Sequence, residues 1–459
     1  MIGIIILNIS ILISNITVNE IEKFDDKLPD IKTELLAPAK NMKAVKAAAK
    51  YSDAIYFGIK NFNMRERADN FELKDLMKVV NYCHDRNVKA VIASNILVYD
   101  HELDNLKMLL ESAVACEVDS VIVHDLAALQ MAKELGLPFH ISTQCNVSNS
   151  ISAKFYEDLG AERIIMAREC SLEKIKKIKS NLTKAMIESF VHGAMCTAIS
   201  GRCYFSAVIC GDSANRGKCI QPCRRSWRVI DTENNEFIYD GVRFMNSRDL
   251  CMVHHIPEMI EAGIDCLKIE GRMRSPHYVD VVSGVYRDAI ESYYDGTYSK
   301  KKASKWIKEL RKVYNRGFTT GFYFKRPTES EHQHVSPTNL SHYRMIKMGK
   351  IKEYDPETKL ATVLLTNGKV YKGLEIFITS STTETYFKQE VFWALFDGKK
   401  VKETPKASPR KPIEIKLTMI DEVIPGEDKI YVFTNKTYKN RYLLKKKKDK
   451  IKKSDYYRL

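Results

Sequence analysis

Short apolar runs alternate with amphipathic segments over the first two thirds of the chain, and this alternation restricts the fold more than any other feature. The runs are rich in Ile, Val and Ala, and the segments between them, such as 73–87 and 103–117, carry apolar residues at helical spacing. Strand–helix alternation predicts parallel βαβ units, and eight such runs predict a closed (β/α)8 TIM-like barrel, an α/β fold. The predicted strands are 34–39, 54–59, 89–94, 120–125, 139–144, 163–168, 186–191 and 265–270.

Polar residues gather where these predicted strands end. In a (β/α)8 barrel the carboxyl ends of the strands form the rim that carries the active site. Strands often end in polar residues for structural reasons alone, which accounts for about half of the cases here. We expect a pocket at this rim, formed by some of the following residues: Gly58, Asn95, His124, Asp125, Gln144, Arg168, Glu169, His192, Glu270 and Arg272.

The pattern changes after residue 298. Residues 300–316 are predicted to be helical, and 320–342 form a loop-rich connector. From residue 343, runs such as KIKEYD, LATVLLT, EIFITS and IYVFT are separated by turn signals, which predicts a small antiparallel β-domain with a long loop at 402–412. The predicted division is a barrel at 32–298, a helical connector at 299–342, a β-domain at 343–436 and a basic tail at 437–459.

The two ends of the chain differ in composition from the rest. Residues 2–16 are mostly apolar but too few to span a bilayer, which takes about 20 residues, and the first basic residue is Lys23. We interpret 1–31 as a dispensable extension and expect no stable membrane association. From Lys436 onward, eleven Lys or Arg face two Asp, so +9 of the total net charge of +15 lies in this tail. The tail is expected either to bind RNA phosphates without sequence preference or to be simply solvated.

Four of the eleven cysteines lie close together in the Gly- and Arg-rich segment 193–226, with the spacing C-x6-C-x15-C-x3-C. An odd number of cysteines in a long chain does not indicate a secreted disulfide framework, so we expect a reduced, cytoplasmic protein. Thiolates grouped in this way bind soft metals. Zinc sites favour two close pairs, and an iron–sulfur cluster tolerates irregular spacing, so both remain open. The four cysteines are Cys196, Cys203, Cys219 and Cys223.

The same segment carries a family signature. The stretch ESFVHGAMCTAISGRCYFS, from Glu188 to Ser206, resembles that of the collagenase-like peptidase family U32, with Phe205 replacing an aliphatic residue. The stretches STQCNVSN (142–149), MNSRDL (245–250) and KIEGRMRSPHYV (268–279) extend the resemblance over about residues 33–300. Within the family, the chain resembles the tRNA hydroxylation proteins of the TrhP type.

The resemblance implies a chemistry that the family's name does not describe. Better understood members are oxygen-independent hydroxylases that act on tRNA wobble uridine, on ribosomal RNA cytidine or on quinone precursors. They carry a 4Fe–4S cluster on cysteines of this segment and are linked to prephenate as the source of the hydroxyl oxygen. The expected partner is therefore RNA, most simply tRNA. Some relatives work in pairs, which implies a homo- or hetero-oligomer.

The resemblance also implies roles for single residues. Cys196, Cys203, Cys219 and Cys223 would hold the cluster, with Cys251 as an alternative fourth ligand. A dicarboxylate donor requires cationic groups, which bind carboxylates as bidentate forks. The predicted catalytic residues are His192, as a proton carrier or simply as a packed histidine, together with Arg168, Glu169 and Glu270. The predicted substrate-binding residues are Arg67, Asn95, Gln144, Arg272 and Arg274.

Two other functions remain open at this stage. The family name implies a protease, but the sequence has neither an HExxH nor a GxSxG motif. A non-catalytic RNA-binding protein with a structural zinc is the second alternative, although a complete barrel with a polar rim exceeds what a structural role needs.

Overall fold

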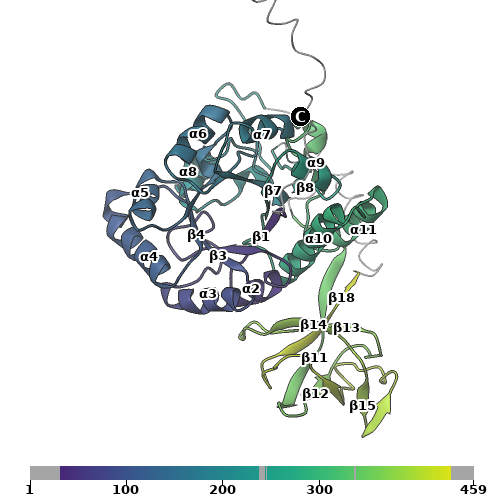
Figure 1. Cartoon of the computed structure of the whole chain (residues 1–459). Helices are drawn as coiled ribbons and strands as arrows, with labels where there is room; N and C mark the ends of the chain where they lie inside the picture. The colour runs from purple at the N-terminus through teal and green to yellow at the C-terminus, as the bar shows by residue number, and fades with distance from the viewer. Residues whose placement is uncertain (1–31, 237–242, 244, 335–337, 436–459) are drawn as a thin grey trace, which may run out of the picture. The chain divides into compact units, whose positions relative to one another are not determined.

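The computed structural model of the chain describes residues 32–236, 243, 245–334 and 338–435, and its first part is the predicted barrel. Eight strands pair in parallel, each with the next along the chain. The last of them, β9, pairs with both β7 and β1 and so closes the sheet (Figure 1). The strands are β1 (Glu34–Pro38), β2 (Ala54–Phe57), β3 (Lys89–Ser94), β4 (Ser120–Val123), β5 (Phe139–Ile141), β6 (Arg163–Ile165), β7 (Met186–Ala194) and β9 (Cys266–Ile269). The prediction of a (β/α)8 barrel is confirmed.

Helices connect the strands and surround the barrel (Figure 1). Several begin at a side chain that accepts a hydrogen bond from the first turn, among them Asn41, Asp125 and Ser275. Most of them bury apolar residues on one face, as in α3, where Leu76 and Val80 are buried. The helices are α2 (Met42–Ala48), α3 (Leu76–His84), α4 (Leu103–Ala115), α5 (Leu126–Glu134), α6 (Ser150–Asp158), α7 (Leu172–Lys179), α9 (Ile256–Glu261) and α10 (Pro276–Tyr294).

The barrel interior is closely packed but contains charged residues. Glu188 of β7 is fully buried and accepts hydrogen bonds from Lys268 of β9 at 2.7 Å and from Arg163 of β6 at 3.4 Å. Arg163 also pairs with Glu34 of β1 at 2.5 Å. Buried charges are tolerated where each has an opposite charge and a hydrogen-bond partner, which holds for these side chains.

Two short strands extend the sheet beyond the predicted barrel. Strand β8 (Asp249–Cys251) runs antiparallel to the end of β7, and β10 (Phe318–Thr319) pairs with β8. Arg316 fixes this extension through Asp249 at 2.7 Å, and both side chains are almost completely buried. Because β8 pairs with residues 192–194 of β7, strand β7 continues beyond the barrel as far as Ala194. The cysteine segment begins at this end of β7.

The part of the chain after the barrel begins with α11 (Lys300–Leu310), which is shorter than the helix predicted over 300–316. An antiparallel sheet with its own core follows, as predicted. Its strands are β11 (Tyr343–Asp355), β12 (Leu360–Leu365), β13 (Glu375–Thr379), β14 (Tyr386–Glu390), β15 (Ala394–Phe396), β16 (Lys399–Val401), β17 (Ile413–Thr418) and β18 (Lys429–Asn435). The segment 402–412 makes isolated bridges, in keeping with the predicted loop.

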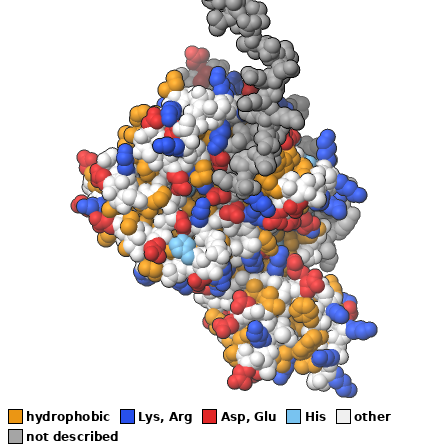
Figure 2. Space-filling model, viewed as in Figure 1, with side chains coloured by type: hydrophobic (Ala, Val, Ile, Leu, Met, Phe, Trp, Pro, Cys, Tyr) orange, Lys and Arg blue, Asp and Glu red, His pale blue; other side chains and the backbone are white. Residues whose placement is uncertain are grey.

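The predicted N-terminal extension (1–31) and the basic tail (437–459) lie outside the described residues. Within the described part of the chain, no helix has the length and apolar character needed to cross a membrane. Figure 2 shows Lys and Arg side chains mixed with Asp and Glu over the visible face, so that face carries no single continuous basic surface.

Candidate active site

A cavity of about 430 Å³ opens at the carboxyl ends of the barrel strands. Side chains from the strands form its floor, among them Tyr56, Phe190 and Lys268, and the cysteine segment forms its opposite wall. The predicted residues Asn95, Gln144, Arg168, Glu270 and Arg272, with Arg67 and Arg274, all line it. The expectation of a pocket at this rim is thus met in the structure.

The cysteine segment packs directly onto the rim because two glycines allow close approach. A Cβ atom at Gly201 would lie 1.9 Å from the carbonyl oxygen of Gln144, and one at Gly217 would lie 2.2 Å from that of Asn63. Both glycines also have positive φ angles, of +76° and +80°, which other residues rarely adopt. Larger residues at either position would push the segment off the barrel.

Arg224 fixes the end of the same segment. Its side chain is buried and donates hydrogen bonds to the carbonyl oxygens of Met195 at 2.6 Å and Ser247 at 2.7 Å. Met195 directly precedes Cys196, and Arg224 directly follows Cys223. The guanidinium of Arg224 therefore holds the backbone next to the first and the last of the four cysteines in place.

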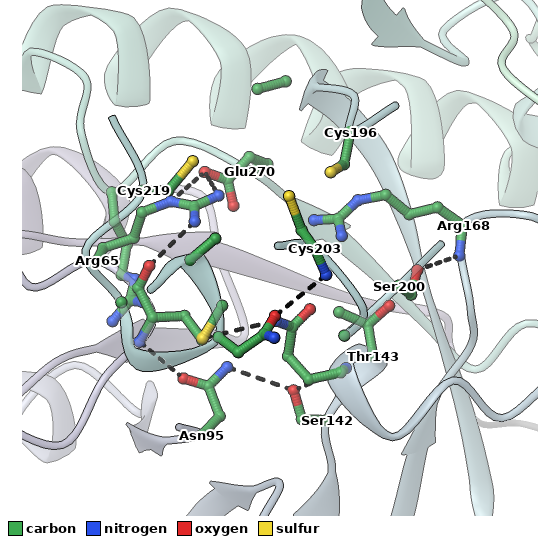
Figure 3. A pocket seen from close by; sticks show the side chains of 18 of the residues that line it. Arg65, Asn95, Ser142, Thr143, Arg168, Cys196, Ser200, Cys203, Cys219 and Glu270 are labelled. Carbon is green, nitrogen blue, oxygen red and sulfur yellow. Dashed lines mark hydrogen bonds and ion pairs between the residues drawn. The ribbon is translucent and has the colours of Figure 1, made fainter. Parts of the chain in front are cut away.

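All four predicted cysteines line the cavity, and Figure 3 shows three of them, Cys196, Cys203 and Cys219, directed into it. None forms a disulfide. Burial raises the pKa of the Cys203 and Cys223 thiols, so a bound metal or cationic group is needed to stabilise their thiolates. Among the described residues, no three His, Cys, Asp or Glu side chains are close enough to hold one metal ion. Cys251 lies elsewhere, with its sulfur 3.7 Å from the Tyr286 hydroxyl.

Glu270 is the single acidic residue among the described residues that line the cavity. Arg65 donates to its carboxylate through Nη2 at 3.1 Å and Nε at 3.3 Å (Figure 3). Burial opposes ionisation, but the charges of Arg65, Arg168 and Arg272 prevail and lower the pKa of Glu270 to about 2. Glu270 is therefore a fixed carboxylate that orients Arg65.

Cationic side chains greatly outnumber this one carboxylate. Arg272 is buried, its Nη1 has no hydrogen-bond partner in the described part of the chain, and burial lowers its pKa to about 10. Lys268 lies 4.4 Å from the centre of the Tyr56 ring, and Arg274 lies 3.5 Å from that of Tyr314. Such an excess of positive charge, part of it on buried side chains, favours an anionic ligand. The eight cations that line it are Arg65, Arg67, Arg168, Arg202, Arg224, Lys268, Arg272 and Arg274.

Three other predicted residues contribute shape and local contacts. Asn95 accepts a hydrogen bond from the Met64 amide at 3.1 Å and donates to Ser142 at 3.3 Å. Gln144 contacts the Met64 sulfur at 3.5 Å, and Arg67 pairs with Asp212 at 2.7 Å. Asn95 and Gln144 therefore hold the rim loops together as well as lining the cavity.

His192 and Glu169 do not line the cavity, which contradicts a catalytic role for them there and agrees with the alternative of a packed histidine at 192. The register of β7 against β9 shifts between Phe190 and His192, and this β-bulge turns the histidine away from the cavity. His192 is buried and bonds the Tyr286 hydroxyl at 3.2 Å, and burial lowers its pKa to about 4, so it is a neutral packing residue. Glu169 accepts hydrogen bonds from the backbone N–H and the hydroxyl of Ser200, both at 2.7 Å, and thereby anchors the cysteine segment.

Sequence reasoning did not identify Arg65 and Lys268 as pocket residues. Arg65 lies in an irregular loop after β2 and meets Glu270 only because the barrel closes, so no local pattern marks it. Lys268 and Glu188 did carry a signal. A charged residue inside an otherwise apolar strand is expensive unless it is paired, so two such residues on neighbouring strands predict a buried pair.

The fold and the cavity together define a (β/α)8-barrel protein with a thiol-lined, cation-rich pocket at the rim. The chain belongs to Peptidase family U32, whose sequence model matches residues 40–333. It is 42% identical over 344 residues to an uncharacterized protease, MJ0090, of Methanocaldococcus jannaschii, over 73% of this chain and 84% of that protein. A collagenase of Porphyromonas gingivalis is 34% identical over 414 residues, 87% of this chain and 97% of the relative. The tRNA hydroxylation protein P1 of Bacillus subtilis is 34% identical over 340 residues, 72% of this chain and 80% of the relative.

Proposed function

We propose that this protein is an oxygen-independent RNA hydroxylase with an iron–sulfur cluster, and that it forms 5-hydroxyuridine at the wobble position of tRNA from a prephenate-like dicarboxylate. One observation carries the proposal: four cysteines and an excess of cations line the same cavity. The similarity to a protein named for tRNA hydroxylation supports it. Names of relatives alone do not decide the activity, because others are named as a protease and a collagenase.

The cysteine residues suit a cluster better than a single ion. Four free thiols face one cavity, yet within the described residues no three metal-ligating side chains meet at one point. A mononuclear zinc site needs its ligands around one centre, whereas a cluster spreads its cysteines around several iron atoms. Cys196, Cys203, Cys219 and Cys223 would hold a 4Fe–4S cluster, which supplies one-electron chemistry when bound.

The remaining pocket residues bind and orient the donor. Arg272 and Arg274 line the same cavity as Glu270 and offer guanidinium groups for the two carboxylates of the donor. Lys268 adds a positive charge at the cavity floor, where its partner Glu188 keeps it in place. The Arg65–Glu270 ion pair fixes the part of the cavity wall between these donor-binding cations and Cys219. A thiolate at Cys219 would also interact with Arg65.

The first test is anaerobic purification followed by analysis of iron, zinc and acid-labile sulfide. We expect about four irons and four sulfides per chain, as in a 4Fe–4S cluster, and their loss in Cys203→Ala. The matched control is Cys210→Ala, because Cys210 is an exposed cysteine of the same segment that does not line the cavity. One zinc and no sulfide would overturn the cluster and favour a zinc-containing RNA-binding protein.

The second test is mass spectrometry of nucleosides from cells with and without the gene. Loss of 5-hydroxyuridine from tRNA is expected, and loss of hydroxycytidine from ribosomal RNA would instead identify that substrate. Unchanged levels of both would refute the RNA hydroxylase. Cleavage of gelatin by cluster-intact protein would favour the protease, although no histidine is present among the described residues of the cavity wall to activate a cysteine.

A further inference from the structure

The cysteine segment exposes an unusual concentration of large apolar side chains. Ile199 is 58% exposed, Tyr204 is 71%, Val208 is 79% and Ile209 is 41%. All four lie within eleven consecutive residues, and the last two belong to the short helix α8 (Phe205–Cys210). Single exposed apolar residues are ordinary, but four within one short segment indicate an interaction surface.

This surface is attached to the cavity. Ile199 and Arg202 line the cavity, and Tyr204 directly follows Cys203. The side of α8 that faces the protein is held by Ser206, which is fully buried. Its hydroxyl accepts a hydrogen bond from the Ile220 amide at 3.1 Å and lies 3.8 Å from the sulfur of Cys219. The apolar side chains are therefore presented to solvent at a fixed position beside the thiols.

Unpaired cations accompany these apolar side chains. Arg202, Lys218 and Arg225 are exposed, and in the part of the chain that the structure describes none of them forms an ion pair. The nearby acid Asp212 is already paired with Arg67. The Tyr204 side chain is 71% exposed, and its ring makes no aromatic or cation–π contact within the part of the chain that the structure describes.

We propose that this surface, the platform formed by Ile199, Tyr204, Val208 and Ile209 with Arg202, Lys218 and Arg225, binds unpaired nucleotides of an RNA loop next to the target base. Bases stack on exposed aromatic rings and aliphatic side chains, and phosphates are neutralised by the flanking cations. The set contains three cations and no acidic residue, so its charge is complementary to the phosphates of RNA. The inference rests on the proposed function, since it names where the RNA substrate of that pocket docks.

The experiment measures fluorescence anisotropy of a labelled RNA stem-loop with full-length, anaerobically purified protein over a series of salt concentrations. Tyr204→Ala should weaken binding about 5- to 150-fold at every salt concentration, the loss expected for one stacked base. Tyr204→Phe should bind like the wild type because it keeps the ring. Lys218→Ala should instead lower the salt slope by about 0.7, as for one phosphate contact with a single strand.

Two further variants keep the interpretation clear. Phe155→Ala removes an aromatic residue of α6 that is 57% exposed and does not belong to the platform, and it should leave RNA affinity unchanged. Val208→Glu places a negative charge on the platform away from the cysteine ligands and should weaken binding even if Tyr204→Ala disturbs the cluster. Iron and sulfide content is measured for each variant.

The possible results distinguish failure of the proposed RNA-binding platform from failure of the proposed hydroxylase function. If the wild type binds the stem-loop and Tyr204→Ala and Val208→Glu bind equally well, the platform is wrong and the RNA hydroxylase stands. If the cluster-intact wild type binds no RNA at low salt, both proposals are overturned. If these variants change the oligomeric state in light scattering without changing RNA affinity, the surface is a protein interface and the platform is refuted.

Discussion

The interior of the barrel and the cavity at its rim both contain buried charges, but in different balance. Inside the barrel, Glu34 and Glu188 are matched by Arg163 and Lys268, and each pairs with an opposite charge. In the cavity, a single carboxylate, that of Glu270, stands among many cations within the described residues. The two regions are contiguous, since Lys268 belongs to both.

The difference separates charges that stabilise the fold from charges available to a ligand. A buried charge with its partner inside the protein contributes little net stability, but losing one partner is costly. A buried cation without a partner already costs stability, and only a bound anion removes that cost. The balance of charge, rather than the presence of charge, therefore distinguishes the ligand site from the interior.

Glu188→Leu is the strongest test of the interior. It leaves both Lys268 and Arg163 without this carboxylate, and we expect the free energy of unfolding to fall by about 3–5 kcal/mol. Urea denaturation measures the effect. Glu188→Gln keeps the shape and some hydrogen bonding, so its loss should be smaller. Equal stability of Glu188→Leu and the wild type would show that the interior charges are not coupled as the structure indicates.

Glu270→Gln tests the one fixed carboxylate of the cavity through its pH dependence. The pKa of Glu270 is about 2 in the folded protein and 4.5 without the protein's influence, so ionisation favours the folded state. This stabilisation, about 3 kcal/mol, is complete above pH 4.5 and disappears as the pH falls towards 2.

The difference in unfolding free energy between the wild type and Glu270→Gln, measured on metal-free protein, should therefore be constant from pH 7 to 5 and shrink below that. Asp212→Asn is the control, because Asp212 lies at the exposed rim, paired with Arg67. A difference that persists unchanged to pH 3 would contradict the assignment of this pKa to Glu270.

Sequence reasoning succeeded where a local pattern determines the structure. The eight barrel strands are marked by their apolar runs, and the cysteine segment follows the seventh of them directly. Strand β8 was missed because its three residues, Asp249–Cys251, carry no strand pattern and are ordered by pairing with β7. In the β-domain the named runs correspond to β11, β12, β13 and β18, whereas β14 to β17 were not named.

Side-chain direction and distant contacts limited the prediction of the site. Strand periodicity alone places His192 on the same side as Glu188 and Phe190, and only the β-bulge in β7 reverses it. Arg65 and Glu270 are 205 residues apart, so their ion pair becomes visible only in the folded chain. The ligation of a cluster by the four cysteines stays a prediction.

Arg272→Met sharpens the comparison because its effect on binding should be much larger than its effect on stability. Removing the buried Nη1, which has no hydrogen-bond partner in the described structure, favours the folded state, whereas losing a positive charge near Glu270 opposes it, so the free energy of unfolding should change by no more than about 1 kcal/mol. Binding of a dicarboxylate such as prephenate should weaken at least about tenfold, as for loss of one charge-assisted pair. Thermal denaturation with and without the ligand measures both effects.

The matched control for Arg272→Met is Arg163→Met, which removes a buried arginine that does have carboxylate partners. It should destabilise the protein strongly. If both arginine variants lose stability to the same extent, Arg272 is a structural residue and the distinction between the two regions fails.

Glu403→Gln gives the smallest expected effect and shows that distance alone does not measure an ion pair. Lys369 and Glu403 of the β-domain lie 2.5 Å apart, closer than the 2.7 Å between Lys268 and Glu188. Both side chains are about half exposed, however, and water and salt screen exposed pairs. We expect the free energy of unfolding to change by no more than about 0.5 kcal/mol, and less at high salt. A loss as large as that of Glu188→Leu would mean that burial does not control the strength of these pairs.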